Sequence, residues 1–258
     1  MKMLQIEPKI RKEYARGSYN KFDDVEQWIR ISEGCPNNCI FCRETVECGK
    51  DPIYLPIPKI VRNQVKILDM NFIYKPKALQ ILKDLGSRRV NGKVIYYEFK
   101  CGIDYRYLTF ELAHALKDAR FINIRISWDF SFGLQRRIKK AIDILVKAGY
   151  KSKDITVFMI CNWLITYEEN CRKIDLCKVW NVKCADCYFD NQLSPNIKPI
   201  HWNHKEIKSF RDKVRTHDQM VNFGIDPEWK DEYFRKKEQT TLDKISDDNK
   251  KLNNVEEK

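Results

Sequence analysis

The segment EGCPNNCIFCRET, residues 33–45, places three cysteines within eight positions, at Cys35, Cys39 and Cys42. Their spacing is C-x3-C-x2-C, and the glycine, proline and two asparagines around them are typical of a loop. Thiolates at this spacing can surround one compact metal centre. A structural zinc site asks for four protein ligands, whereas three cysteines on a cubane iron–sulfur cluster leave one iron open for a non-protein ligand. The sequence therefore predicts a metal centre on this loop.

Short runs rich in β-branched or aromatic residues precede and follow this loop and predict strands over 27–32, 65–69, 94–99, 122–127, 155–160 and 181–186. Amphipathic patterns between them predict helices over 76–86, 133–150, from 166 onward and near 205–217. Gly86 and Gly149 are the expected helix stops, and Thr166 with Glu169 forms a capping box.

Strands that alternate with helices predict an α/β fold in which a parallel sheet is covered by helices. The expected architecture is a partial (β/α)6 TIM-like barrel with parallel strands, plus a polar C-terminal tail. In such folds the chemistry gathers at the C-terminal ends of the strands, where the cysteine loop begins. We expect an N-terminal extension over 1–24, a core domain over 25–225 and a charged, flexible tail over 226–258.

The 258-residue chain is 43% hydrophobic and 33% charged, and it carries a formal net charge of +12. The stretch 230–258 holds eight basic and eight acidic residues, so the whole excess lies in residues 1–229. A basic body favours anionic partners such as nucleic acid or phosphorylated metabolites. No apolar run is long enough to span a membrane, no signal-peptide core is visible, and clustered cysteines suit a reducing compartment. We therefore expect a cytoplasmic protein with no membrane partner.

The three cysteines, with Phe41 just before the last one, resemble the signature of the radical S-adenosylmethionine (radical SAM) superfamily. The resemblance covers residues 25 to about 190 and is strongest at the cysteine loop. It implies a [4Fe-4S] cluster on Cys35, Cys39 and Cys42, whose open iron is chelated by the amino and carboxylate groups of S-adenosyl-L-methionine. It further implies reductive cleavage to a 5′-deoxyadenosyl radical that abstracts a substrate hydrogen. An electron donor such as flavodoxin or ferredoxin would supply the electron.

The resemblance also implies cofactor-binding residues beyond the loop. Many family members carry Gly-Gly-Glu after the second strand, but this chain has LDMNF instead, so Asp69 and Asn71 are expected to meet the amino group of the cofactor. An Asx turn at the strand end is the alternative. Arg125, Ser127 and Asp129 share one face of the fourth strand and are expected to contact its ribose and carboxylate. The alternative is an Arg–Asp pair that seals the barrel interior.

A second metal site is an open alternative, because the stretch 171–187 holds four more cysteines. An iron–sulfur cluster would use Cys171, Cys177, Cys184 and Cys187, whereas a zinc site would use Cys184 and Cys187 with His201 and His204.

Two functions therefore compete. The first is a radical SAM enzyme that acts on an anionic or nucleic-acid-related substrate, because basic residues such as Lys100 and Arg106 and several aromatic residues follow the strands. The second is a non-catalytic basic iron–sulfur or zinc protein that binds nucleic acid.

Overall fold

The computed structural model describes residues 17–37, 39, 42, 44, 48–161, 164–188 and 202–224. Phe41, His201 and the predicted tail over 226–258 lie outside the described residues.

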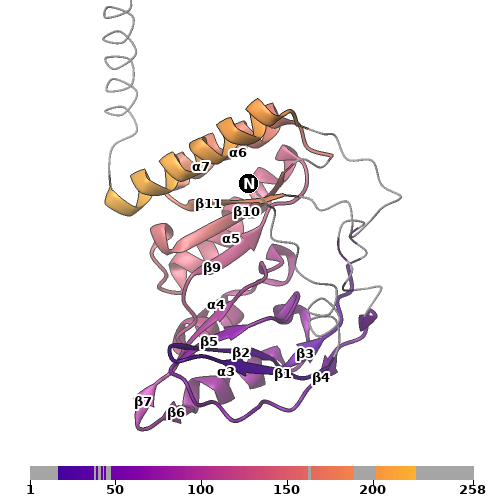
Figure 1. The fold of residues 1–258 in the computed structure, drawn as a ribbon, viewed down its shortest axis with the longest axis vertical. Helices are drawn as coiled ribbons and strands as arrows, with labels where there is room; N and C mark the ends of the chain where they lie inside the picture. The colour runs from indigo at the N-terminus through magenta and orange to yellow at the C-terminus, as the bar shows by residue number, and fades with distance from the viewer. Residues whose placement is uncertain are drawn as a thin grey trace, which may run out of the picture.

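All the predicted strands are present, and they form two sheets (Figure 1). The first sheet has the order β1-β2-β5-β8, with β1 (Tyr19–Phe22), β2 (Glu26–Arg30), β5 (Gln64–Ile67) and β8 (Tyr96–Phe99). The second has the order β11-β10-β9, with β9 (Ile124–Ser127), β10 (Ile155–Cys161) and β11 (Lys183–Tyr188). Apart from β1, which is antiparallel to β2, the strands in these two sheets pair in parallel.

Backbone hydrogen bonds join the two sheets between β8 and β9. The amide of Ile122 donates to the carbonyl of Tyr97 at 2.8 Å, and the amide of Ile103 donates to the carbonyl of Arg125 at 2.7 Å. Parallel bridges pair Tyr97 with Phe121 and Ile103 with Ile126. The described strands therefore form one continuous arc of parallel strands in the predicted order, although they do not close into a barrel.

Helices separate the strands as predicted: α3 (Ala78–Ser87), α4 (Phe110–Asp118), α5 (Gln135–Lys147), α6 (Tyr167–Trp180) and α7 (His204–Phe223). Short 3-10 turns lie at the strand ends: η1 (Phe72–Tyr74), η2 (Tyr105–Tyr107), η3 (Phe132–Leu134) and η4 (Ser152–Asp154). Two small antiparallel pairs complete the fold, namely β3 (Ser32–Glu33) with β4 (Ile53–Tyr54) and β6 (Arg89–Val90) with β7 (Lys93–Val94).

The predicted helix ends are partly confirmed. Gly149 follows α5 with a φ of 96°, a left-handed conformation that glycine adopts without strain. Thr166 caps α6 by accepting from the Glu169 amide, but the Glu169 carboxylate accepts from the Phe132 amide rather than closing a capping box. Gly86 does not stop α3, which continues to Ser87. A Cβ at Gly86 would come 3.2 Å from the Cα of Ala119, so this glycine allows α3 to approach the end of α4.

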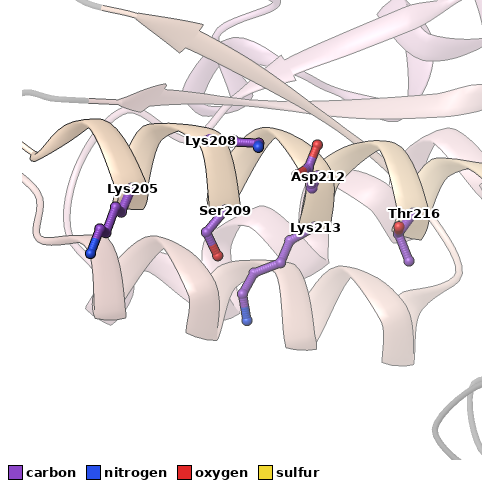
Figure 2. A pocket seen from close by; sticks show the side chains of 6 residues that line it. All are labelled: Lys205, Lys208, Ser209, Asp212, Lys213 and Thr216. Atoms are coloured by element: carbon purple, nitrogen blue, oxygen red, sulfur yellow. The ribbon is translucent and has the colours of Figure 1, made fainter. Parts of the chain in front are cut away.

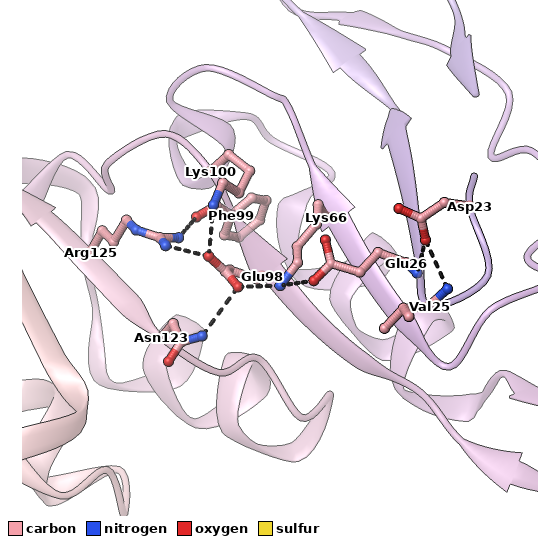
Figure 3. Close-up of polar contacts among 9 residues, drawn as sticks. All are labelled: Asp23, Val25, Glu26, Lys66, Glu98, Phe99, Lys100, Asn123 and Arg125. Atoms are coloured by element: carbon pink, nitrogen blue, oxygen red, sulfur yellow. Dashed lines mark hydrogen bonds and ion pairs between the residues drawn. The ribbon is translucent and has the colours of Figure 1, made fainter. Parts of the chain in front are cut away.

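The two faces of the arc carry different side chains. The face toward the helices is apolar, with Ile29, Ile67, Tyr97, Ile126 and Val157 fully or almost fully buried. The opposite face carries the charged ladder drawn in Figure 3, which runs from Glu26 through Lys66 and Glu98 to Arg125. Burial of Glu98 favours its neutral form, but hydrogen bonds from Lys66, Asn123 and Arg125 favour the carboxylate more strongly. The net effect lowers the pKa of Glu98 to about 2. These contacts tie the four parallel strands β2, β5, β8 and β9 together with paired, ionised groups.

Asp218→Asn tests how much the burial of one carboxyl group, between α7 and β11, lowers the free energy of unfolding. Asp218 accepts from the Cys184 amide at 2.8 Å, and burial raises its pKa from 3.8 to about 6. Between about pH 4 and about pH 6, the folded chain keeps a proton on Asp218 that the unfolded chain has lost. Asp218 therefore lowers the free energy of unfolding as pH rises through this range. Asparagine keeps the acceptor without the charge and should raise the free energy of unfolding by about 1 kcal/mol at neutral pH. Urea unfolding at several pH values measures this, and a gain that persists at about pH 4 would contradict it.

Candidate metal and cofactor site

The structure places the three-cysteine loop where the sequence predicts it, at the C-terminal end of the first parallel strand. Cys35 is buried just beyond β3, and its amide donates to the carbonyl of Gly49 at 3.2 Å. Cys39 and Cys42 are half-buried, and the amide of Cys42 donates to the carbonyl of Cys39 at 2.9 Å. The loop therefore leaves the sheet from a fixed point and turns so that its last two cysteines stay close.

Gly34 fixes the backbone from which the loop starts. Its φ is 88°, and a Cβ there would lie 2.1 Å from the carbonyl oxygen of Asp51. A larger residue would therefore combine an unfavourable backbone conformation with a collision against main-chain atoms.

The two predicted residues after β5 lie beside the loop. Asp69 is buried and accepts from the Ile31 amide at 2.9 Å and from the Ser32 hydroxyl, so it links the end of β5 to the end of β2. Burial raises the pKa of Asp69 to about 6. Asn71 has a φ of 42°, and its Nδ2 lies 3.5 Å from the Sγ of Cys35. Its Oδ1 is buried with no hydrogen-bond partner among the described residues, so it can accept from a donor outside them.

Asp104, which follows β8, connects the loop to two other strand ends. Its Oδ2 accepts from Asn37 of the cysteine loop at 2.7 Å and from Asn71 at 3.4 Å. Arg106 holds the same carboxylate with two hydrogen bonds of 2.8 and 2.6 Å. Although burial opposes it, the contacts with Arg106 and Asn37 lower the pKa of Asp104. The sequence places Arg106 after a predicted strand, but nothing in it indicated the contact between Asp104 and Asn37.

The three residues predicted on the fourth strand have different surroundings. Arg125 pairs with Glu98 and donates to the carbonyl of Phe99 at 2.6 Å, so it belongs to the charged ladder and its partner is not Asp129. Ser127 pairs with Phe158 of β10 and packs closely on Gly102. A Cβ added to Gly102 would lie 2.1 Å from the Oγ of Ser127. Glycine is therefore the residue that fits at 102. Of these three residues, Asp129 lies farthest along the strand direction, beyond the C-terminal end of β9.

Asp129 is half-buried, and burial raises its pKa to about 6. The charge of Lys173 and a hydrogen bond from the Ile160 amide oppose this rise. Its negative charge in turn contributes to the raised pKa values of Cys39 and Cys42. The carboxylate therefore lies within electrostatic range of the cysteine loop.

Lys173 of α6 was not anticipated, and it is fully buried behind this strand end. Its Nζ donates to the carbonyl of Trp128 at 3.2 Å and lies 5.4 Å from the centroid of the Trp128 ring. Burial lowers its pKa to about 8, although the negative charges of Glu169 and Asp129 oppose this shift. The buried stripe of α6, which comprises Asn170, Lys173, Ile174 and Cys177, has the i, i+3, i+4, i+7 spacing of a core face. Two polar residues on such a stripe are the signal that could have identified Lys173.

The thiols of Cys39 and Cys42 favour their protonated form. Burial and the neighbouring thiols Cys42 and Cys35 raise the pKa of Cys39 to about 11, and burial also raises the pKa of Cys42. Metal binding must displace these protons, so it should become more favourable as pH rises.

The geometry of the donors bears on which metal they suit. Among the described residues, which include the three loop cysteines, no three His, Cys, Asp or Glu side chains are gathered closely enough to hold a single metal ion. Zinc needs each sulfur at about 2.3 Å from one point, whereas a cubane cluster spreads its thiolates over separate irons. Cys35, Cys39 and Cys42 match the number of thiolates that a cubane cluster with one open iron takes from the protein.

The second predicted metal site is not supported by the part of the chain that the structure describes. Cys177 of α6 and Cys184 of β11 are buried against each other in the core, and burial with the Cys177 contact raises the pKa of Cys184. Cys187 is three residues further along β11 and lies on its other face. Cys171 is half-buried on α6. The four sulfurs therefore do not converge.

Comparison with known proteins relates the fold to one solved enzyme. No protein-family model matches this sequence, and no curated protein matches it. The structure is similar to coproporphyrinogen III oxidase (HemN) from Escherichia coli, a radical SAM enzyme, with a TM-score of 0.52 and 13% sequence identity. The match covers 76% of this chain and 52% of the other, so this chain spans about half the length of that enzyme. The likeness concerns the fold, which the two proteins share over most of this chain.

Gly34→Ala should displace the start of the cysteine loop and lower the iron bound after anaerobic reconstitution to less than half of the wild-type amount. The physical reason is the 2.1 Å approach to the Asp51 carbonyl. Gly92→Ala is the matched control, because Gly92 also has a positive φ (75°) but its Cβ would meet nothing within 4 Å. Iron and sulfide assays with thermal unfolding measure both variants. Equal iron loss in Gly34→Ala and Gly92→Ala would contradict this prediction, because the strain of a positive φ would then explain the loss without the contact with Asp51.

Proposed function

We propose that this chain is a cytoplasmic radical SAM enzyme in which Cys35, Cys39 and Cys42 hold one [4Fe-4S] cluster. The core domain would span 25–225, and the arc of parallel strands would serve as a partial (β/α)6 barrel. When bound, the cluster supplies one electron for the reductive cleavage of S-adenosyl-L-methionine. The single observation that carries the proposal is the loop with Cys35, Cys39 and Cys42 at the C-terminal end of the first parallel strand.

The fold gives independent support, because a solved radical SAM enzyme has a similar structure. The position of the loop agrees with the rule that parallel α/β folds carry their chemistry at the C-terminal strand ends. No helix in the described part of the chain has both the length and the apolar character needed to cross a bilayer.

The chain's own residues would bind and orient the cofactor. The unpartnered Oδ1 of Asn71 would accept from the cofactor's amino group beside Cys35. Asp129 would accept from the ribose hydroxyls, since it lies at the end of β9 within electrostatic range of Cys39. Asp69 and Arg125, which the resemblance also assigns to the cofactor, would act by holding the strand ends through their contacts with Ser32 and Glu98. Phe41 lies outside the described residues, so its cofactor role stays a prediction.

The alternative function is a basic iron–sulfur or zinc protein that binds nucleic acid without catalysis. The net charge of +12 is compatible with both functions. Turnover of the cofactor separates them, because a binding protein has no need to cleave it.

Anaerobic reconstitution tests the proposal. The wild-type chain should bind about four irons and four sulfides. With dithionite and S-adenosylmethionine it should release 5′-deoxyadenosine and methionine. Cys39→Ala should lose most of the iron and all of the cleavage, whereas Cys171→Ala, which removes a half-buried thiol on α6, should keep both. Zinc bound in place of iron, or cleavage by Cys39→Ala, would contradict the proposal.

Lys173→Met tests the role of Asp129. Methionine keeps an apolar side chain of similar length and removes the desolvation cost of the ammonium, while the hydrogen bond to the Trp128 carbonyl is lost. The change removes the positive charge that opposes the raised pKa of Asp129, so more of this carboxyl group is neutral at about pH 7. The dissociation constant for S-adenosylmethionine, measured by calorimetry on the cluster-loaded protein, should rise about tenfold at about pH 7 and much less at about pH 9.

Lys178→Met is the control for this variant, because Lys178 is a more exposed lysine of the same helix that pairs with Asp175. It should leave the affinity unchanged. A pH-independent loss in Lys173→Met would mean that Lys173 supports the fold and does not act through Asp129.

A further inference from the structure

Helix α5 carries the most one-sided charge of the described helices. Its thirteen residues, QRRIKKAIDILVK, include five basic side chains and one acidic one. Arg136, Arg137, Lys140 and Lys147 are exposed, while Lys139 pairs with Asp143 at 2.5 Å and so neutralises the only acid. The surface of this helix is therefore strongly positive.

The charges of α5 form a stripe. At about 100° per residue, Arg136, Lys140 and Lys147 fall within about 40° of one another around the helix axis. The buried residues Ile138, Ala141, Ile142 and Leu145 occupy the opposite side. The rise of about 1.5 Å per residue makes the stripe about 16 Å long. We call Arg136, Lys140 and Lys147 the α5 track.

The N-terminal end of the track lies at the mouth of the site. Helix α5 packs against both η2 and η3, which follow β8 and β9. Arg106 of η2 adds an exposed guanidinium group there, bound to Asp104, the residue that contacts the cysteine loop. The track therefore continues from the candidate cofactor site outward over the surface.

Aromatic side chains lie at both ends of the track. Phe130, the residue after Asp129, is 45% exposed at the mouth. Phe110 is 44% exposed beside Lys147, whose Nζ lies 5.2 Å from the centroid of its ring. An exposed aromatic ring next to a row of cations offers stacking for a base and pairing for phosphates.

We propose that the α5 track binds the phosphate backbone of a single-stranded nucleic acid and that Phe130 stacks a base at the entrance of the candidate cofactor site. This inference rests on the proposed function and gives its substrate class. A strand has about one phosphate per 3.4 Å of rise, so a stripe of about 16 Å can pair with several phosphates. An acidic protein would also be attracted to the charge, but a base stacked on an exposed ring beside cations that pair with phosphates is particular to nucleic acid.

The test uses the full-length, cluster-reconstituted protein and labelled single-stranded RNA and DNA of mixed sequence, with fluorescence anisotropy over a range of salt concentrations. Arg136→Gln/Lys140→Gln/Lys147→Gln should weaken binding at least tenfold. It should also lower the slope of log K against log salt by about 2, since three phosphate contacts are lost at about 0.7 each. Phe130→Ala should weaken binding about tenfold and leave the slope unchanged, because stacking carries no counterion release.

The groove on α7 in Figure 2 provides the matched control, because it also presents three exposed lysines. Lys205→Gln/Lys208→Gln/Lys213→Gln removes the same number of charges from another helix and should change the affinity less than twofold. Equal losses in the two triple variants would overturn the proposal, because net charge alone would then explain binding. Binding of an acidic flavodoxin at the track in place of nucleic acid would overturn it as well.

Failure of this inference and failure of the proposed function give different results. The track variant should keep its iron and its substrate-free cleavage of S-adenosylmethionine, because its residues lie outside the candidate cofactor site. Cleavage without any nucleic-acid binding would overturn the inference alone. Track-dependent binding by a protein that cannot cleave the cofactor would instead overturn the proposed function.

Discussion

The carboxylate of Asp104 is the contact on which the arrangement of the candidate site depends. It accepts from Asn37 of the cysteine loop and from Asn71 beyond β5, and Arg106 holds it in place from η2. Three segments that are distant in sequence therefore meet at one charged group. A carboxylate with several directed donors is held much more precisely than an apolar contact would be. Asn37 of the cysteine loop is therefore tied to the residues that follow β5 and β8.

The inner face of the strand arc divides into two regions with different chemistry. Within the strands, Glu26, Lys66, Glu98 and Arg125 pair with one another, so each of these charges has a partner. Toward the C-terminal ends, Asp129 is not paired in this way, and the Oδ1 of Asn71 has no partner among the described residues. The first region stabilises the arc, whereas the second leaves polar groups for a bound molecule. This division explains why residues on the same strand, such as Arg125 and Asp129, have different roles.

The sequence predicts the strands, the order of the parallel arc and the position of the cysteine loop, because these depend on local pattern and on the rules for parallel sheets. It does not predict the partner of Arg125, because Glu98 lies on a neighbouring strand and only the register brings the two together. It also misses the role of Gly86, which depends on how closely α4 approaches α3. Lys173 was missed because a lysine in a helix is ordinarily exposed, and only its place on the buried stripe indicates otherwise.

The central claim is that three thiolates hold a four-iron cluster with one iron left for the cofactor. Mössbauer spectroscopy on the iron-reconstituted, oxygen-protected protein tests this claim most directly, before and after S-adenosylmethionine is added. The account predicts a four-iron cluster in which about one quarter of the iron signal shifts when the cofactor binds. Four irons that all remain unchanged with saturating cofactor, or a protein that binds no cluster, would contradict it.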